Sequence, residues 1–254
     1  MRVFRGFDDL PAFRSGVATI GSFDGVHCGH KALLGRVCEL ARENDGESVV
    51  FTFDPHPRIT LGCADGLRLL DTAEEKLIGL ERAGIENVVF IPFTQEFSRL
   101  SAEEFISDYI VGKAGIVDLV VGYDHRFGRD KQGDFALLST VGRAAGLEVV
   151  EVGQQLAGGE KVSSTVVRRA VADGDMERAA RLLGEPYTVI GRVESDGEII
   201  SPEREYKLMP PAGRYAALVG GVETELTIDS GGRAYICGVA KAEKCEIKIV
   251  KRIC

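Results

Sequence analysis

The sequence predicts an α/β protein in which a Rossmann-like domain with a parallel sheet is followed by a small antiparallel β-barrel-like domain. Two observations predict this fold class. Between residues 17 and 152, five short apolar segments alternate with segments of helical periodicity, the pattern of a parallel sheet covered on both faces. After residue 187 the chain changes to short segments of alternating polarity separated by turn residues, which is typical of antiparallel sheet.

The first strand is expected over 17–21, and the first helix from residue 31, where apolar residues recur at helical spacing. The turn between them is rich in glycine and polar side chains: Gly21, Asp24, Gly25, His27, Gly29 and His30. Glycines let the backbone approach a ligand closely, and a helix start offers unpaired N–H groups and a positive dipole end. Two imidazoles three residues apart lie on one side of a helical turn. The turn therefore predicts a phosphate-binding site.

A His-x-x-His pair is also compatible with a zinc site or with no function. Zinc takes three or four protein ligands, whereas His56 and His125 lie in other loops and the six cysteines have no paired spacing. We therefore favour phosphate over zinc and expect no metal-binding side chains. Cys28 lies inside the same turn and is a weaker candidate for a nucleophile.

The remaining elements of the first domain follow from local signals. Further strands are expected over 48–53, 87–91, 117–121 and 147–152. The second strand ends in the Asp54–Pro57 turn, where proline cannot continue a ladder. Capping boxes at Thr72–Glu75 and Ser101–Glu104 predict two helix starts, and a third helix is expected over 135–145. Residues 1–16 are expected to be irregular.

All histidines of the chain lie in loops that directly follow the first, second or fourth expected strand: His27, His30, His56 and His125. The carboxyl ends of parallel strands meet at one edge of the sheet, and ligands of such folds bind there. We therefore expect the histidine-bearing loops to share one site.

A second anion-binding segment is predicted near residue 163. Ser163, Ser164 and Thr165 precede a short helix that carries Arg168, so hydroxyls, helix N–H groups and a guanidinium come together. The alternative is an ordinary serine cap on a surface helix, which the segment taken alone fits better. The next helix is expected to begin after Asp175.

The domain boundary is expected near residue 186. We assign residues 1–186 to the first domain and 187–254 to the β domain, whose short alternating segments are separated by Asp-Gly, Pro-Pro and Ser-Gly-Gly turns.

Composition excludes several classes of function. The net charge of −8 and the lack of any block of lysines and arginines argue against a nucleic-acid partner. The charged N-terminal segment predicts no signal peptide, and no apolar run approaches the roughly 20 residues of a membrane helix. Six cysteines without paired spacing are typical of reduced thiols, so we expect a cytoplasmic protein without membrane contact.

Four segments in this order resemble the signature motifs of the bacterial bifunctional riboflavin kinase and FAD synthetase (FMN adenylyltransferase) family: GSFDGVHCGH, FTFDPHP, GYDHRFG and SSTVVR. The resemblance covers residues 17–187 nearly continuously. It implies a nucleotidyltransferase that moves the adenylyl group of ATP to FMN, giving FAD and pyrophosphate without a covalent intermediate. Val166 departs from the family, which usually has a basic residue at this position.

The resemblance also implies the site residues. For catalysis these are Asp24, His27, His30 and Arg168. For binding ATP and its phosphates they are Gly21, Phe23, Gly25, Gly29, Asp124, Arg126, Ser163, Ser164 and Thr165. For binding FMN they are Phe53, Pro55, His56 and Pro57. Mg²⁺ is expected to be held mainly by the phosphates of ATP rather than by protein side chains.

The C-terminal part departs further from this family. The Gly-Phe-Pro-Thr-Ala-Asn motif of the kinase domain cannot be read after Tyr187, and only Pro-x-Gly-x-Tyr survives, in the segment MPPAGRYAALV. We therefore expect a truncated, kinase-like β domain without riboflavin kinase activity that stabilises the first domain or mediates association, a homo-oligomer being possible. The alternatives are a bifunctional enzyme with a diverged kinase, a non-catalytic flavin or nucleotide sensor, and a nucleotidyltransferase with another acceptor.

Overall fold

The computed structural model describes residues 1–63, 66–123, 133–201 and 205–253. The chain forms two compact units that are not consecutive in sequence. Unit 1 comprises residues 1–23, 30–66 and 80–154, and unit 2 comprises residues 24–29, 67–79 and 155–254.

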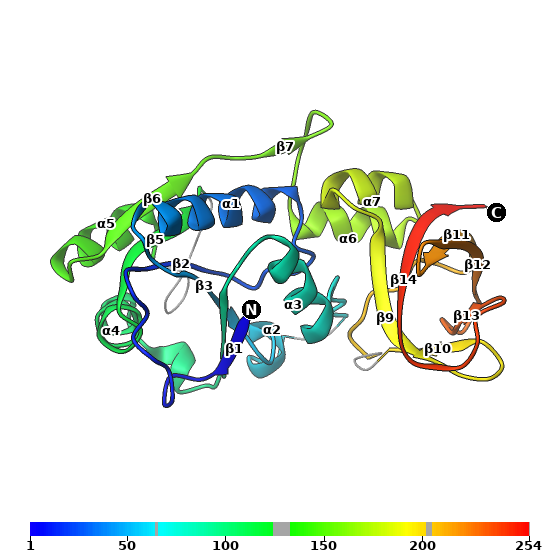
Figure 1. The fold of residues 1–254 in the computed structure, drawn as a ribbon, viewed down its shortest axis with the longest axis horizontal. Coiled ribbons are helices and arrows are strands. Elements are labelled where there is room, and N and C mark those ends of the chain that lie inside the picture. The colour runs from blue at the N-terminus through cyan, green and yellow to red at the C-terminus, as the bar shows by residue number, and fades with distance from the viewer. Residues whose placement is uncertain (64–65, 124–132, 202–204, 254) are drawn as a thin grey trace. The chain divides into compact units, whose positions relative to one another are not determined.

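Unit 1 is built on a parallel sheet of six strands in the order β1-β4-β3-β2-β5-β6 (Figure 1). The strands are β1 (Arg2–Arg5), β2 (Gly16–Ile20), β3 (Ser48–Phe53), β4 (Asn87–Ile91), β5 (Ile116–Gly122) and β6 (Glu148–Val152). From β2 the chain moves outward through β3 to β4 and then crosses to β5 on the other side of β2. The strand order therefore reverses beside β2, the place where ligands bind in open α/β sheets.

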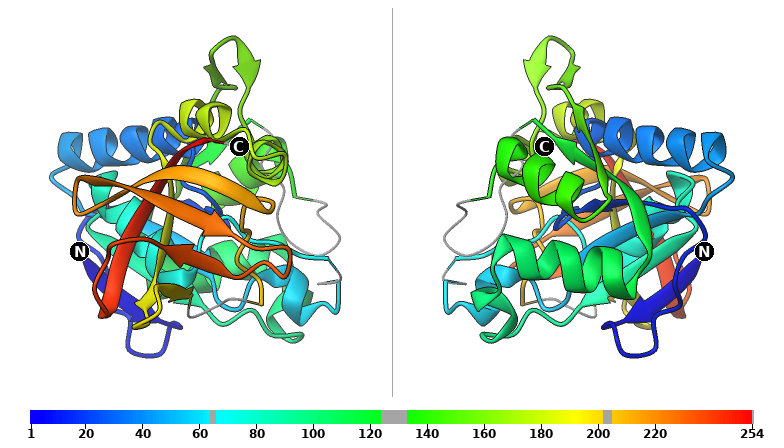
Figure 2. Two further views of the ribbon diagram at one scale, coloured as in Figure 1. Left: turned by 90° about the vertical axis from the view of Figure 1, so that its right-hand side faces the viewer. Right: turned by 90° about the vertical axis from the view of Figure 1, so that its left-hand side faces the viewer.

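Helical segments connect these strands, and all but α3, whose residues 73–79 belong to unit 2, lie mainly in unit 1. They are α1 (Cys28–Glu43), α2 (Pro57–Thr60), α3 (Ala73–Arg82), η1 (Phe97–Arg99), α4 (Ala102–Glu104), η2 (Phe105–Lys113) and α5 (Phe135–Ala144). Figure 1 shows α1 along one face of the sheet, and the right-hand view of Figure 2 looks onto α5 and η2. Alternate strand residues such as Ala18 and Ile20 join Ile106 and Ile110 of η2 in one buried cluster. Val17 and Thr19, on the other face of β2, are fully buried as well, as expected for a sheet covered on both sides.

Unit 2 holds two short helices and a closed antiparallel barrel, whose strands can be followed in the left-hand view of Figure 2. The helices are α6 (Ser164–Ala172) and α7 (Met176–Leu183), preceded by a small hairpin of β7 (Leu156–Ala157) and β8 (Glu160–Lys161). The barrel order is β10-β13-β12-β11-β14-β9. The strands are β9 (Tyr187–Val193), β10 (Glu198–Ile200), β11 (Gly213–Val219), β12 (Val222–Ile228), β13 (Ala234–Ile236) and β14 (Ala242–Arg252).

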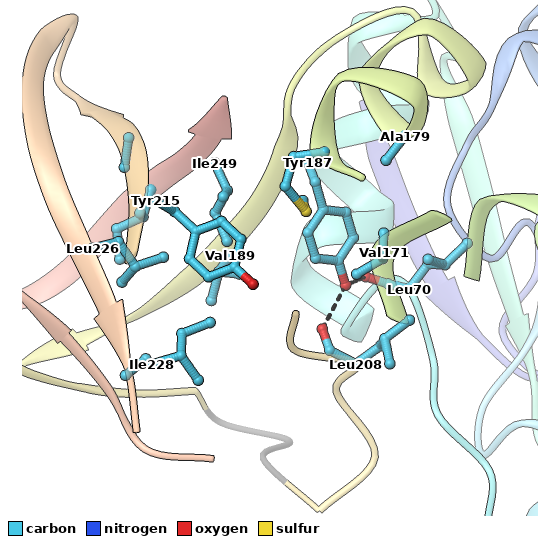
Figure 3. Packing of buried hydrophobic residues seen from close by; sticks show 14 of the residues in the cluster. Leu70, Val171, Ala179, Tyr187, Val189, Leu208, Tyr215, Leu226, Ile228 and Ile249 are labelled. Carbon is cyan, nitrogen blue, oxygen red and sulfur yellow. Dashed lines mark hydrogen bonds between the residues drawn. The ribbon is translucent and has the colours of Figure 1, made fainter. Parts of the chain in front are cut away.

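One apolar core joins the barrel to the helices of unit 2 (Figure 3). Val171 of α6 and Ala179 of α7 belong to the same buried cluster as Tyr187 and Leu226 of the barrel. Leu70, from the segment that leads into α3, is fully buried in this cluster too. The barrel therefore has no core separate from that of the helices.

The predicted fold class, a Rossmann-like parallel sheet followed by a small antiparallel barrel, is confirmed. The predicted bounds of β3 and β4 match those observed. The expectation for residues 1–16 is wrong in part, because β1 pairs with β4 in parallel at the sheet edge. The β7–β8 hairpin was not predicted either, since each of its strands has only two residues.

Candidate functional site

Asp24 is the central residue of the glycine-rich turn in unit 2. The residue is 2% exposed, and each of its carboxylate oxygens has two hydrogen-bond donors. Oδ1 accepts from the backbone N–H groups of Leu70 (2.8 Å) and Asp71 (3.1 Å). Oδ2 accepts from Nε (3.2 Å) and Nη2 (2.9 Å) of Arg168. This carboxylate therefore fixes the turn to the residues just before α3 and to α6.

The start of α6 lies against the same turn. Ser163 is the N-cap, and its hydroxyl accepts from the N–H of Val166 at 3.4 Å. The hydroxyl of Ser164 donates to the backbone carbonyl of Asp24 at 2.8 Å. Thr165 is exposed on the first turn of the helix. The turn and the serine-rich segment therefore contact each other in unit 2, and the serine hydroxyls hold backbone groups.

Arg168 is tied to the turn and still reaches solvent. Its side chain is 28% exposed, whereas that of Asp24 is 3% exposed. Within the described residues, its hydrogen bonds go to Asp24 through two of the five donors that a guanidinium carries. The site consequently combines a neutralised ion pair with a helix N-terminus.

Two glycines are needed for the shape of this turn. Gly25 has φ +90°, and a Cβ there would lie 2.5 Å from Cδ1 of Leu70. A Cβ on Gly29 would lie 3.2 Å from the ring of His27. Any side chain at residue 25 would displace the backbone from its position beside Leu70.

Asp71 was not identified from the sequence. Its Oδ2 accepts from the N–H of Gly25 at 2.8 Å. Burial raises the pKa of this carboxyl to about 7, and the negative charges of Asp24 and Glu75 act in the same direction, whereas Lys207 lowers it. A single aspartate before a capping box carries no sequence signal for such a role, because its partners are distant along the chain.

The two imidazoles of the HxGH motif flank the start of α1. His27 is 5% exposed and directly precedes the helix, and His30 lies in its first turn. Within unit 1, the ring of His30 lies 5.1 Å from the ring of Phe23, centroid to centroid. Phe23 is buried with φ +46°, a left-handed conformation that is strained for a bulky residue. A Cβ on Gly21 would lie 3.1 Å from the ring of Phe23, so the glycine makes room for it.

The turn after β3 carries the residues predicted for FMN. The ring of Phe53 lies 5.3 Å from that of Phe93 and 6.5 Å from that of Phe97, forming an aromatic cluster at the carboxyl end of the strand. The peptide between Asp54 and Pro55 is cis. His56 caps α2, its Nδ1 accepting from the N–H of Arg58 at 3.2 Å, and Pro57 is the first residue of that helix. Phe93 and Phe97 were missed in the sequence, where an isolated phenylalanine gives no indication of its neighbours.

The predicted site residues fall into three groups. Unit 2 contains Asp24, Gly25, His27, Gly29, Ser163, Ser164, Thr165 and Arg168. Unit 1 contains Gly21, Phe23, His30, Phe53, Pro55, His56 and Pro57. Asp124 and Arg126 lie outside the described residues. Across the described ranges, no group of three or more His, Cys, Asp or Glu side chains is placed to hold a metal ion.

A parallel sheet with a switch point beside its central strand, joined to an antiparallel barrel, defines a Rossmann-like α/β protein with a β-barrel module. The FAD synthetase family model matches residues 10–166. The chain belongs to the FAD synthetase family. The family predicted from the four sequence motifs is thereby confirmed.

The chain is similar to several characterised relatives. It is 37% identical over 201 residues to the bifunctional riboflavin kinase/FMN adenylyltransferase of Escherichia coli K12, covering 78% of this chain and 64% of the relative. It is 41% identical over 196 residues to the enzyme of that name from Pseudomonas fluorescens, covering 76% and 62%. The chain thus spans less than two thirds of the length of these relatives.

A solved structure matches over the whole length. The crystal structure titled as a macrolide-efflux protein from Streptococcus pneumoniae has a TM-score of 0.83 at 25% identity and covers 100% of both chains. In the described part of our chain, every helix is too short or too polar to cross a membrane.

Proposed function

We propose that the chain is an FMN adenylyltransferase, which transfers the adenylyl group of ATP to FMN and releases pyrophosphate. The observation that carries the proposal is the joining of the HxGH-bearing turn to the serine-rich start of α6 through Asp24. Membership of the FAD synthetase family supports it.

The reaction requires charge stabilisation rather than a strong base. The phosphate monoester of FMN has a second pKa of about 6, so the nucleophilic oxygen is already anionic at neutral pH. This oxygen forms a bond to the α-phosphorus of ATP, the bond from that phosphorus to the bridging oxygen of the β-phosphate breaks, and pyrophosphate leaves with the electron pair. The protein has to align two anions and stabilise the charge that develops on the transferred group.

The residues of unit 2 fit the triphosphate side of this reaction. The N-terminal N–H groups of α6 offer donors and a positive dipole end to phosphate oxygens, and Thr165 is exposed beside them. We assign His27 and His30 to the α-phosphate and the departing pyrophosphate, and Arg168 to the same charge. Asp24 has the role of holding Arg168 and the turn in position.

The flavin side is assigned from the resemblance. Phe53, Pro55, His56 and Pro57 present an apolar, rigid turn after β3, and Phe93 extends its aromatic surface. Flat apolar side chains suit an isoalloxazine ring.

Mg²⁺ is proposed to enter with ATP. The carboxylate of Asp24 already accepts four hydrogen bonds, so the turn supplies no carboxylate oxygen that is ready to ligate a cation. Mg²⁺ keeps water and substrate phosphates as ligands, and when bound it would reduce the repulsion between the reacting anions.

Purified protein incubated with FMN, MgATP and pyrophosphatase tests the proposal, with FAD measured by chromatography. We expect FAD to form and His30→Ala to lower turnover by about 10²-fold or more, a loss typical of removing a group that stabilises developing charge. Glu39→Ala, on the exposed face of the same helix, is the matched control and should leave turnover unchanged. Unchanged FMN with the wild-type chain would refute the proposal, and tight binding without turnover would identify a sensor instead.

Riboflavin plus MgATP is the second arm. We propose that residues 187–254 have no kinase activity, so no FMN should form. Accumulation of FMN in this arm would identify the chain as bifunctional.

A further inference from the structure

The barrel is bonded directly to residues 69–75, which lead into α3 and form its first turn and are here called the 69–75 segment. Tyr206 and Leu208, the chain neighbours of Lys207, form backbone hydrogen bonds with this segment. The N–H of Leu69 donates to the carbonyl of Tyr206 at 2.7 Å, and the N–H of Leu208 donates to the carbonyl of Leu69 at 2.8 Å. An isolated parallel bridge between Leu69 and Lys207 therefore joins the 69–75 segment to the chain between β10 and β11.

Lys207 is a buried cation at this junction. Its side chain is fully buried and donates to Oε2 of Glu75 (2.7 Å), to the carbonyl of Leu70 (2.6 Å) and to the carbonyl of Thr188 (2.9 Å). The ammonium also lies 4.4 Å from the centre of the Tyr187 ring. A lysine uses at most three donors, and all three are engaged here.

Glu75 completes the connection from the α3 side. Its side chain is 3% exposed. Oε1 accepts from the N–H of Ile190 in β9 at 2.7 Å, and Oε2 accepts from the N–H of Thr72 at 2.8 Å in the capping box of α3. A buried ion pair whose polar atoms all have hydrogen-bond partners holds the two segments that carry it in one arrangement. Loss of one partner leaves the other charged and uncompensated.

Tyr187 adds a neutral contact. Its hydroxyl lies 2.9 Å from the carbonyl of Leu70 and 2.7 Å from the carbonyl of Leu208 (Figure 3). Both carbonyls thus converge on one hydroxyl between the barrel and the 69–75 segment.

The opposite side of the 69–75 segment holds the nucleotide-binding turn. The N–H groups of Leu70 and Asp71 donate to Asp24, and Asp71 accepts from the N–H of Gly25. Leu70 therefore bonds to the barrel through its carbonyl and to the turn through its N–H. A shift of the peptide at Leu70 would be passed to Asp24 and to the Arg168 that it orients.

We infer that the barrel acts as a positioning element for the nucleotide-binding turn, with Lys207, Glu75 and Tyr187 as positioning residues that act through Leu70 and Asp71. The inference rests on the proposed function in one respect, namely that the turn binds ATP. It gives the C-terminal β domain a role in adenylyl transfer that requires no kinase chemistry.

A pair of conservative variants in the 254-residue chain tests this. Tyr187→Phe removes the hydroxyl that contacts the 69–75 segment. Tyr215→Phe is the matched control, because the hydroxyl of Tyr215, also in the barrel, donates to the carbonyl of Pro211 at 2.6 Å rather than to the 69–75 segment. We expect Tyr187→Phe to raise both KM and Kd for ATP about threefold, the effect of one hydrogen bond, with Tyr215→Phe close to wild type.

Lys207→Met is the stronger perturbation. We expect it to weaken ATP binding and kcat/KM for ATP about tenfold or more, measured at low temperature where circular dichroism reports a folded chain. Leu226→Ala, which opens the barrel core away from the segment, controls for lost stability and should leave KM for ATP unchanged. Glu75→Gln added to Lys207→Met removes the unpaired charge and should recover most of the binding.

The outcomes separate the two proposals. If the wild-type chain makes FAD and both tyrosine variants, or Lys207→Met and Leu226→Ala, change KM equally, the positioning role is overturned and the proposed function stands. If the wild-type chain makes no FAD but binds ATP, and Lys207→Met alone weakens that binding, the positioning role stands without the proposed reaction. A wild-type chain that neither binds ATP nor makes FAD overturns both.

Discussion

The ion pair of Asp24 and Arg168 is expected to hold the glycine-rich turn to α6, and this can be tested directly. The perturbation is a double-mutant cycle of Asp24→Asn and Arg168→Met. Asparagine keeps a carbonyl oxygen for the two backbone N–H groups that Oδ1 accepts, and methionine keeps most of the apolar stem of the arginine. The cycle therefore isolates the two charge-assisted hydrogen bonds between the side chains.

The expected coupling lies between the values for surface and buried pairs. Asp24 has a 3% exposed side chain, but that of Arg168 is 28% exposed and is screened by solvent. Exposed pairs couple by about 0.2–1 kcal/mol, and loss of one member of a fully buried pair costs about 3–5 kcal/mol. A two-bond, half-buried pair should give a coupling free energy of about 1.5–3 kcal/mol.

The assay is urea unfolding followed by circular dichroism, with the free energy of unfolding of each single and double variant compared at constant m-value. The control cycle uses Arg169 of α6 and Asp173, the C-cap of this helix, whose charged groups are 3.8 Å apart with side chains 80% and 61% exposed. We expect this control to give less than about 0.5 kcal/mol. A coupling for Asp24 and Arg168 no larger than that of the control would refute the claim that this pair holds the turn to α6.

Three further outcomes are expected. The pKa of Asp71 is about 7 in the folded chain, against 3.8 for an ordinary aspartate. Between these pH values the native state binds more protons than the unfolded state, so stability falls as pH rises, by at most about 4 kcal/mol, and Asp71→Asn should flatten this slope in unfolding measurements from pH 5 to 8. Gly25→Ala should destabilise the chain by about 2 kcal/mol or more, because the added Cβ would lie 2.5 Å from the side chain of Leu70. Gly62→Ala, at a residue with φ +67° and open space around it, should cost about 1 kcal/mol. Equal losses of stability in thermal unfolding would contradict the close packing of Gly25 against Leu70. Burial raises the pKa of the Cys38 thiol, so a thiol reagent at pH 7.5 should label exposed Cys63 much faster, as mass spectrometry of the peptides would report.

The parts of the fold that follow from local chemistry could be predicted. The apolar runs of β3 and β4 are bounded by turn residues on both sides, and their predicted limits match the observed ones. The capping box at Ser101 is present with both of its hydrogen bonds, and that at Thr72 likewise. In each case the interacting atoms lie within a few residues of one another, so the sequence pattern contains the whole interaction.

What could not be predicted depends on partners far apart in the chain. Arg168 was predicted to bind an anion, but its observed partner Asp24 lies 144 residues away, and no periodicity relates the two. Lys207 reads in the sequence as an ordinary surface lysine, yet it is fully buried beside Glu75, 132 residues away. The strand β1 was not predicted because it has only four mostly exposed residues, and its two apolar residues lie between two arginines.

The pairing of Asp24 with Arg168 changes what the site can offer to a phosphate. Since the carboxylate neutralises the guanidinium, the attraction for an anion at this end of α6 comes first from the helix N–H groups and dipole. A phosphate bound there would take the remaining donors of Arg168 and draw the guanidinium away from Asp24. Because Asp24 also accepts from Leu70 and Asp71, that shift would be passed to the segment on which the turn rests. Arg168→Lys would keep the charge but lose the paired donors to Oδ2, so it should weaken triphosphate binding by positioning rather than by charge, with a rise in KM for ATP that added salt does not reproduce in the wild-type chain.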